Sequence, residues 1–583
     1  MKLTDEQVHA VDLFKRSQTL KISAFAGTGK TSTLVAAAES TRKGGLYLAF
    51  NKSIAAEAAG KFPRSVDCRT MHSMAFRAVS SRYRENAGKL TQSLHGNHVS
   101  KLLGLQEIAV GNITLLPRSL AFVTTKTIQR FCQSGDEELV CRHVPVTGKL
   151  QLLDSEYQDE FKQYVSQLAA HLWDQMQDPK SEVPLGHDGY LKVWSLSKPR
   201  LNYDFLLLDE AQDTNEAVLS VLRSQDSQLT LVGDRHQQIY EWRGAINAMA
   251  SVETEAEAVL THSFRFGASV AEAATSILRI LGETRTMVGN PNRDTTISAE
   301  GKTSTVLCRT NAGVVSVVVD ALFEKRRPHV VGGVTELIRM LEDVSKLKRS
   351  IPVESPEFLG FKDWSDVVDF SQAEEGESLR SFVKIVAAHG ELALVEKLGS
   401  VSREEVEADL IVSTGHKAKG REWDSVTLLA DFDPRINKDD PPKQVLNQEE
   451  ARLLYVAVTR AQKLLVVPSR LAEKWNVRPA LAAPTAAPSR VSARNVTRET
   501  PTRTRPDLPS FAKVIKPSPV ATSQTSASPA SRTDLPTTQR KTEIPCAPVV
   551  ESVRTHRAAP GARVPTTQPG LLTSIFRILQ GKK

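Results

Sequence analysis

Short apolar runs that end abruptly in small or charged residues recur along the chain. Phe205–Leu208 stops at Asp209–Glu210, and Leu229–Val232 stops at Gly233–Asp234. Runs of this kind are typical of buried parallel strands, whose polar ends meet at the carboxyl edge of a sheet. Ligands of open α/β sheets bind at that edge. The pattern therefore predicts a ligand site at which these carboxylates lie together.

The first fifty residues alternate between helical and strand patterns. Leu3–Arg16 has helical spacing, and Thr4 with Gln7 forms a capping box at its start. A strand, a glycine-bearing turn, a helix and a second strand follow, and this order indicates a parallel α/β sheet. The segments expected here are a strand at Leu20–Phe25, a helix at Thr31–Ser40 and a strand at Leu46–Phe50.

A second α/β pattern begins at Leu260, and two helical stretches interrupt the strand-rich parts of the chain. Its expected strands are Thr305–Cys308, Leu410–Ser413, Val426–Leu429 and Leu464–Val467. We therefore predict two α/β domains with parallel sheets, each carrying a helical insertion. The predicted bounds are 1–76 and 200–262 for the first domain, 77–199 for its insertion, 263–336 and 407–470 for the second domain, and 337–406 for its small insertion.

The composition changes after Arg470. The net charge of the 583 residues is +8, but residues 471–583 alone carry a net +12 and the rest sums to −4. Of the 29 prolines, 15 fall in this last segment, among Ala, Ser, Thr and Arg. Such a sequence buries too little apolar surface to offset its ordering entropy, so we predict a disordered basic tail over 471–570. Residues 571–583 have helical apolar spacing, which predicts an amphipathic helix that docks on a protein partner or packs on its own body.

No apolar run reaches about 18 residues, so no membrane-spanning helix is expected. Met1–Lys2 leads directly into polar residues, which predicts no secretory signal. The expected location is intracellular, and it is cytoplasmic and nucleoid-associated if the chain is bacterial or phage-encoded. The five cysteines form no CxxC pair, which argues against a zinc or iron–sulfur site.

Residues 24–31, AFAGTGKT, follow a predicted strand and open a predicted helix. In a phosphate-binding loop, backbone N–H groups around Gly27, Thr28 and Gly29 turn toward the phosphates. Lys30 would reach the outer phosphates and Thr31 would hold Mg²⁺. The strict pattern has glycine where this chain has alanine at position 24, and a chance glycine turn is the alternative interpretation.

The polar strand ends supply the rest of a hydrolysis site. Asp209 is predicted to hold Mg²⁺ through water, and Glu210 to accept a proton from the attacking water. Gln237 follows the next strand end, where an amide contacts both a γ-phosphate and that water. Arg265 and Arg460 are candidate arginine fingers. For each residue alone, the alternative is an acidic helix cap, a solvated glutamine or a surface arginine.

Together these segments resemble the superfamily 1 DNA helicases of the UvrD/Rep type, over residues 3 to about 468. The matching segments are LTDEQ, AFAGTGKT, LAFNKSIAAEA, CRTMHS, LLLDEAQD, VGDRHQQIYEWRGA, LTHSFRFG, STGHKAKGREWDSV and EEARLLYVAVTRA. Phosphate loops of that family often begin with alanine. LTHSFRFG, HDGYLKVW and LLYVAVTRAQK most resemble the F-box DNA helicase branch. No F-box precedes Leu3, so we do not expect that branch's ubiquitin-ligase role, and 337–406 is short for the second insertion of the better-known bacterial members.

The resemblance implies that both α/β domains are RecA-like and adds further site residues. Gln7 would read adenine, Phe264 would stack on it, and Glu422 would meet the ribose or its neighbours. The implied DNA-binding residues are Phe50, Asn51, Thr70, His72, Tyr240, Trp242 and Arg243. Aromatic faces stack on bases without sequence preference, and polar groups track phosphates. Packed aromatic and histidine side chains and a solvated glutamate are the alternatives.

The function implied is that of an ATP-dependent DNA helicase that moves on single-stranded DNA from 3′ to 5′. ATP and Mg²⁺ would bind between the two domains, and the substrates would be single strands and duplex/single-strand junctions in repair, recombination or replication. One alternative is a translocase that strips bound proteins and unwinds little. Another is a nucleotide-gated DNA-binding scaffold, which the presence of Glu210 and Arg460 argues against.

Overall fold

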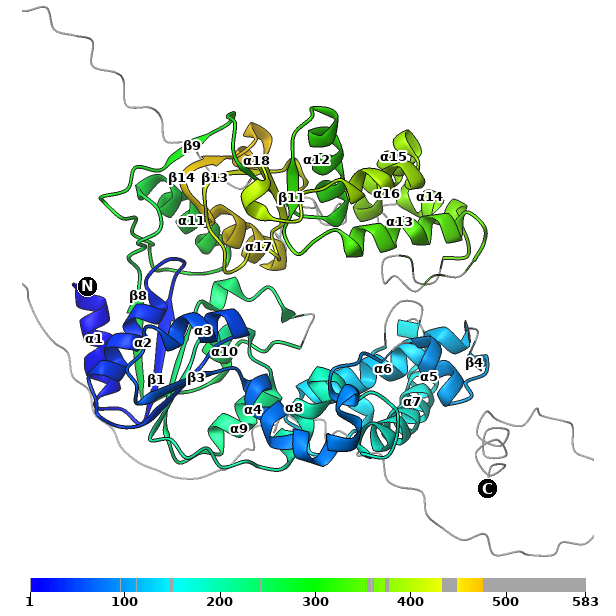
Figure 1. Ribbon diagram of the computed structural model, residues 1–583, viewed down its shortest axis with the longest axis horizontal. Coiled ribbons are helices and arrows are strands. Elements are labelled where there is room, and N and C mark those ends of the chain that lie inside the picture. Colours follow the sequence, from blue (N-terminus) through cyan, green and yellow to red (C-terminus); the bar gives the residue numbers. More distant parts are fainter. Residues whose placement is uncertain are drawn as a thin grey trace, which may run out of the picture. The chain divides into compact units, whose positions relative to one another are not determined.

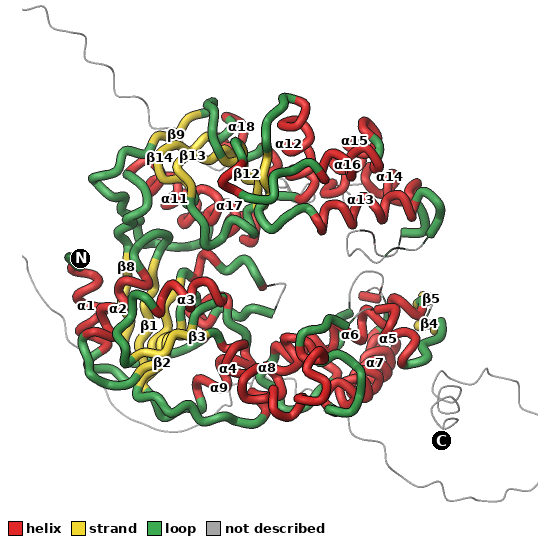
Figure 2. The backbone as a smooth tube through the Cα atoms, viewed as in Figure 1, coloured by secondary structure: helices red, strands yellow, loops and turns green. Residues whose placement is uncertain are grey.

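The computed structural model describes residues 2–474 except 95, 112, 147–149, 152, 242–243, 352, 354–357, 359–360, 373–376 and 433–447. The predicted helix 571–583 and all but the first residues of the predicted tail lie outside the described residues. No helix in the described part of the chain is long and apolar enough to cross a membrane. Figure 1 labels many of the helices and strands, and Figure 2 separates helices from strands by colour.

The first sheet has six parallel strands in the order β3-β2-β6-β7-β1-β8. They are β1 Thr19–Ala24, β2 Gly45–Leu48, β3 Val66–Arg69, β6 Phe205–Leu208, β7 Gln228–Gly233 and β8 Ala256–Leu260. Ser23 pairs with Gly233, and Leu48 pairs with Leu208. The segments that follow β1, β2, β6 and β7 therefore leave the sheet at one edge, as the strand ends predicted.

The strand residues that point to either face of the first sheet are apolar, and helices cover both faces. Phe205 and Leu207 of β6 pack with helices α1 and α2, whereas Leu206 and Leu208 pack with α4 and α9. The helices of this part are α1 Asp5–Phe14, α2 Lys30–Glu39, α3 Lys52–Ala59, α4 Met71–Val79, α9 Glu216–Arg223 and α10 Ala248–Ser251. The capping box predicted for the first helix is present.

The second sheet also has six parallel strands, in the order β11-β12-β10-β13-β14-β9. They are β9 Thr296–Ser298, β10 Thr305–Cys308, β11 Pro328–Val330, β12 Leu410–Thr414, β13 Trp423–Leu428 and β14 Ala461–Val466. Its helices are α11 Ala268–Ile280, α12 Asn311–Phe323, α17 Gln448–Val458 and α18 Ser469–Lys474. Two parallel sheets of this kind confirm the predicted RecA-like α/β fold class.

Mostly helical segments separate strands of each sheet. Between β3 and β6 lie α5 Gly96–Leu102, α6 Pro117–Gln133, α7 Ser155–Gln177 and α8 Gly186–Leu196, together with a hairpin of β4 Ile108–Val110 and β5 Ile113–Leu115 that the sequence did not predict. Between β11 and β12 lie α13 Thr335–Leu347, α14 Trp364–Gln372, α15 Glu377–His389 and α16 Glu391–Gly399. These segments fall where insertions were expected, and the exact domain bounds stay a prediction.

Candidate nucleotide site and strand-contact surface

The glycine-bearing turn after β1 adopts a backbone that requires glycine at two positions. Gly27 has a φ of +74° and Gly29 a φ of +77°, both in the left-handed region. A Cβ on Gly27 would lie 2.6 Å from Oγ of Ser263, so a side chain does not fit there. The turn leads into the first N–H groups of α2, and Thr28 closes it by donating to the Phe25 carbonyl at 2.9 Å. This cradle at a helix N-terminus fits a phosphate group.

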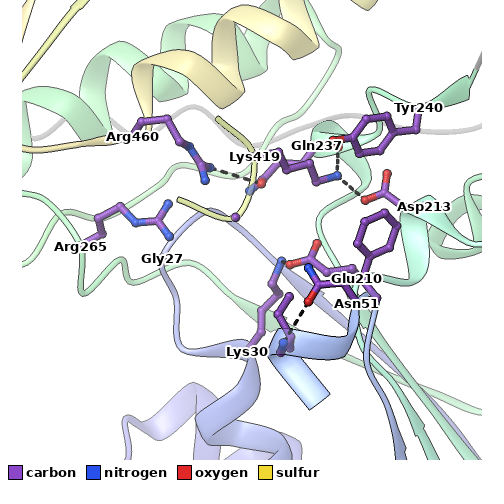
Figure 3. A pocket seen from close by; sticks show the side chains of 13 residues that line it. Gly27, Lys30, Asn51, Glu210, Asp213, Gln237, Tyr240, Arg265, Lys419 and Arg460 are labelled. Carbon is purple, nitrogen blue, oxygen red and sulfur yellow. Dashed lines mark hydrogen bonds and ion pairs between the residues drawn. The ribbon is translucent and has the colours of Figure 1, made fainter. Parts of the chain in front are cut away.

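Lys30 and Glu210 form an ion pair at the carboxyl edge of the first sheet, with 2.6 Å between Nζ and Oε1. Burial favours neutral Lys30, but the charges of Glu210 and Asp209 outweigh it and raise the Lys30 pKa. Burial alone would raise the pKa of Glu210, yet Lys30 and Lys419 lower it to about 2. Glu210 also has a left-handed φ of +51°, a strained backbone that occurs at functional sites. Figure 3 shows this part of the pocket.

Asp209 and Thr31 are placed to share a hard cation. Thr31 Oγ1 donates to Asp209 Oδ2 at 3.4 Å, and Tyr47 donates to the same oxygen at 2.6 Å. The other carboxylate oxygen accepts the Glu210 N–H at 2.9 Å. Burial and the nearby Glu210 raise the pKa of Asp209, while Lys30 opposes the rise. Hydroxyl and carboxylate oxygens are the ligands that Mg²⁺ prefers, so these residues fit the predicted ion.

Gln237 and Arg460 come from different sheets and meet in the pocket. Gln237 donates to Asp234 at 2.8 Å, which leaves its Oε1 to accept from Arg460 Nη2 at 3.4 Å. Arg460 is only 2% exposed, and its other nitrogens donate to the Val456 and Arg421 carbonyls. Burial, together with the charge of nearby Arg265, lowers the Arg460 pKa to about 9. Arg460 is therefore a buried, fixed cation and not a surface side chain.

Arg265 and Glu422 also lie together. Arg265 Nε donates to Glu422 Oε2 at 2.5 Å, and its Nη1 donates to the Thr459 carbonyl at 3.1 Å. Glu422 accepts a second bond from Gln462 at 2.6 Å. The structure thus holds Arg265, which follows β8, against residues that flank β13 and β14.

Gln7 and Phe264 flank the phosphate loop at Gly29. A Cβ on Gly29 would lie 2.9 Å from Nε2 of Gln7 and 3.3 Å from the Phe264 ring. The Gln7 amide is held in place because Oε1 accepts the Thr4 N–H at 3.1 Å and Nε2 donates to Thr33 at 3.1 Å. An oriented amide beside an aromatic ring is an arrangement that suits a purine base.

Lys419 and Asp213 were not assigned a role from the sequence, yet both lie in the pocket. Lys419 pairs with the Asp213 carboxylate and donates to the Gln237 carbonyl. Its Nζ lies 5.4 Å from the centre of the Tyr240 ring. Burial raises the pKa of Asp213 to about 6, against the opposing charge of Lys419. Nothing in HKAKG alone separates Lys419 from Lys417, whose partner is Glu336 on α13.

These residues enclose a cavity of about 130 Å³. It is smaller than the ~300 Å³ of ordinary ligand pockets, since the ion pairs within it occupy the space between the sheets. Its lining residues are Gly27, Lys30, Phe50, Asn51, Ile54, Glu210, Asp213, Gln237, Tyr240, Arg265, Lys419, Gly420 and Arg460.

Phe50 and Tyr240 stack at the rim of the same cavity. Their rings are 6.0 Å apart and only 10° from parallel, and Phe50 is 50% exposed. Tyr240 is anchored because its hydroxyl donates to the His416 carbonyl at 3.1 Å. Asn51 caps α3 by accepting the Ile54 N–H at 2.9 Å. An accessible aromatic pair of this kind offers a stacking platform for bases.

Thr70 and His72, the other described residues predicted to bind DNA, lie outside the lining of this cavity. Thr70 caps α4 by accepting the Ser73 N–H at 3.1 Å. His72 packs edge-on against Tyr190 and His187 of α8, with ring centres 6.0 Å and 6.4 Å away. Burial, opposed by Asp188, lowers the pKa of His72. The predictions for Trp242 and Arg243 lie outside the described residues.

Comparison with known proteins gives matches along most of the folded part. A family model for the UvrD/REP helicase N-terminal domain matches residues 3–256, and one for the UvrD-like helicase C-terminal domain matches residues 409–467. F-box DNA helicase 1 of Gallus gallus is 35% identical over 81% of this chain and 49% of that protein. F-box DNA helicase protein 1 of Schizosaccharomyces pombe is 30% identical over 80% of this chain and 57% of that protein. ATP-dependent DNA helicase Rep of Buchnera aphidicola matches a shorter stretch, 14% of each chain, at 34% identity.

The chain spans about half the length of the two F-box relatives. Both of these relatives are eukaryotic, so a bacterial or phage origin stays a prediction. The matches include the phosphate loop, Asp209–Glu210 and Gln237 in the first model and Arg460 in the second.

Proposed function

We propose that this chain, which belongs to the UvrD/Rep helicase family, is an ATP-driven DNA helicase that moves along single-stranded DNA. The observation that carries the proposal is the shared pocket. It joins Lys30, Glu210 and Gln237 after strands of the first sheet to Lys419 and Arg460 of the second. The Phe50–Tyr240 stack forms the rim of that pocket, so the groups for hydrolysis and for strand contact adjoin.

On ATP binding, Lys30 would leave Glu210 and contact the outer phosphates instead. The ammonium group that holds Glu210 in the structure is the one that a phosphate loop offers to the outer phosphates. Once Lys30 leaves it, Glu210 loses the larger of the two charges that lower its pKa and becomes a better proton acceptor for the attacking water. Mg²⁺, when bound, neutralises phosphate charge, and Thr31 and Asp209 are the residues that would hold it.

The second sheet would complete the site on closure. Arg460 and Arg265 would stabilise the charge that develops on the transferred phosphoryl group. Gln7 and Phe264 would hold the adenine, and Glu422, bonded to Arg265, would lie near the ribose. Lys419 contacts both the Gln237 carbonyl and the Tyr240 ring, so it connects the phosphate site to the aromatic surface for single-stranded DNA.

The test is ATP hydrolysis by the full chain with and without a single-stranded oligonucleotide. We expect strong stimulation by the oligonucleotide, and loss of nucleotide binding in Lys30→Ala. A strand-displacement assay on duplexes with a 3′ or a 5′ single-stranded tail then tests direction, and the family resemblance favours the 3′ tail. Equal hydrolysis with and without DNA would contradict the proposal.

Two other functions predict different results in the same assays. A translocase that strips bound proteins would hydrolyse ATP on DNA and displace a protein block, while leaving duplexes paired. A nucleotide-gated scaffold would bind DNA and ATP without turnover. The intact pairing of Lys30 with Glu210 and the fixed Arg460 favour turnover.

The basic segment 471–583 provides a separate electrostatic prediction, since it carries a net +12. We propose that it tethers nucleic acid through phosphates, with steep salt dependence. DNA affinity of the full chain and of residues 1–474, which keep α18 and its buried Leu471 and Ala472, is measured across a salt series. We expect the truncated chain to show the smaller salt slope, and equal slopes would contradict the tether. A protein partner for residues 571–583 stays a prediction.

A further inference from the structure

Tyr455 of α17 places a buried hydroxyl between the two sheets. The side chain is 0% exposed, and its hydroxyl donates to Asp234 Oδ2 at 2.9 Å and accepts the Ala26 N–H at 3.1 Å. Asp234 follows β7 and Ala26 belongs to the phosphate loop, so both partners lie in the first α/β half. Burial and the charge of Asp234 raise the Tyr455 pKa well above its usual range, which keeps the hydroxyl protonated and makes it the donor to the carboxylate.

The same carboxylate oxygen orients Gln237. Asp234 Oδ2 accepts the Gln237 amide at 2.8 Å, so the amide oxygen of Gln237 faces Arg460. Arg460 follows the end of α17 and therefore moves with Tyr455. We call Tyr455, Asp234, Gln237 and Arg460 the Tyr455 network. The Tyr455 network joins the second half to the first at two contacts, Tyr455 with Asp234 and Arg460 with Gln237.

An ordinary buried tyrosine is the alternative to a functional one. A buried hydroxyl needs a partner, but that partner is commonly near in the fold. Tyr83 is such a case, since it is 1% exposed and donates to the Gln177 carbonyl of the same insertion at 2.9 Å. Tyr455 differs because, among the described residues, the partners of its hydroxyl both belong to the other half, one of them in the phosphate loop.

We propose that Tyr455 is a positioning residue that makes the orientation of Gln237 depend on closure of the two halves, with the Ala26 N–H as the second anchor of its hydroxyl. The inference rests on the proposed ATP hydrolysis. When α17 is seated, Tyr455 shares the Asp234 oxygen with Gln237 and fixes the amide that meets Arg460. When α17 withdraws, Asp234 and the Ala26 N–H both lose this partner, and Gln237 is free to turn.

The test is Tyr455→Phe in the full chain, which keeps the ring and removes the hydroxyl. We expect kcat for DNA-stimulated hydrolysis to fall about 10- to 100-fold, the effect of losing a hydrogen bond to a charged group. Affinity for a fluorescent ATP analogue should change by less than about threefold, because the nucleotide contacts remain. Tyr83→Phe is the matched control, since it also removes one buried hydroxyl, and its kcat should equal that of the wild type.

A double-mutant cycle separates positioning from general destabilisation. In a Gln237→Ala background, Tyr455→Phe should lower kcat by no more than about twofold further, because its effect passes through Gln237. Fully multiplicative losses, a wild-type kcat for Tyr455→Phe, or equal losses of nucleotide affinity and kcat would each overturn the inference. Failure of the proposed function gives a different result: the wild type itself would lack DNA-stimulated hydrolysis.

Discussion

The phosphate pocket and the Phe50–Tyr240 surface differ in how their side chains are held. In the pocket, Arg460 is 2% exposed and Lys30 lies 2.6 Å from Glu210, so charged groups are buried and already paired. At the rim, Phe50 is 50% exposed, and its ring meets Tyr240 on one side. A pocket residue therefore has to exchange one partner for another during function, whereas a rim residue has only to gain one. Substitutions in the two regions should consequently affect different measurements.

The largest expected effect comes from removing Arg460, one of the cations that the second half brings to the pocket. Arg460→Ala should lower kcat about 10³- to 10⁵-fold, the range for an arginine that stabilises a phosphoryl transition state. Affinity for the ATP analogue should stay near the wild-type value, because the phosphate loop belongs to the first sheet. Single-turnover hydrolysis and analogue binding measure the two quantities. Comparable losses of both would assign Arg460 a structural role.

Removing the proposed base comes next. Glu210→Gln keeps the shape of the side chain but cannot accept a proton, so kcat should fall about 10²- to 10⁴-fold. Analogue affinity should hold or rise, since the substitution removes the competing partner of Lys30. Glu272→Gln on the exposed side of α11 is the control and should leave kcat unchanged. Turnover above one hundredth of the wild-type rate in Glu210→Gln would remove Glu210 as the base.

Burial and length explain which strands the sequence could predict. Strand β6 is a continuous apolar run buried on both faces, and β10 is apolar after Thr305 and buried except at Val306, so each formed with the predicted bounds. Strands β3, β8, β9 and β11 of the two sheets were missed. β3 buries only Val66, β8 buries only Ala258 and Leu260, and β9 and β11 have three residues each, so sequence period alone does not identify them.

The site was predictable where a local motif fixes its geometry. The phosphate loop, Asp209–Glu210 and Gln237 follow strands of one sheet, and the parallel order brings them together. Lys419 and Tyr455 were missed because their importance depends on partners about 180 to 430 residues away in sequence. No spacing within α17 shows that its tyrosine reaches Asp234, since that contact exists only when the two sheets pack together.

Phe50→Ala tests the rim alone. It should weaken binding of a single-stranded oligonucleotide by ~1–3 kcal/mol, the value of one aromatic–base stack. The free energy of unfolding should change by less than ~0.5 kcal/mol, as for other surface substitutions, because half of the ring is exposed. Phe323→Ala on α12 is the matched control, since that ring is 56% exposed and lies outside the pocket lining. Equal effects on oligonucleotide affinity in the two variants would show that exposure, and not the stack, decides binding.

An effect of about the size of Phe50→Ala is expected in the pH dependence of stability that the Lys30–Glu210 pair contributes. The folded pKa of Glu210 is about 2, below the usual 4.5, so the folded state favours the carboxylate. A depressed pKa contributes stability above pH 4.5, and that contribution is lost as the pH falls toward 2. The full shift would be worth ~3 kcal/mol, and roughly 1–3 kcal/mol is expected because Glu210 is 24% exposed. Urea unfolding of the wild type and of Glu210→Gln is measured at pH 7 and pH 3. The wild type should lose more of its free energy of unfolding on acidification than the variant does. Equal losses in the two proteins would mean that Lys30 does not hold Glu210 as a carboxylate in solution.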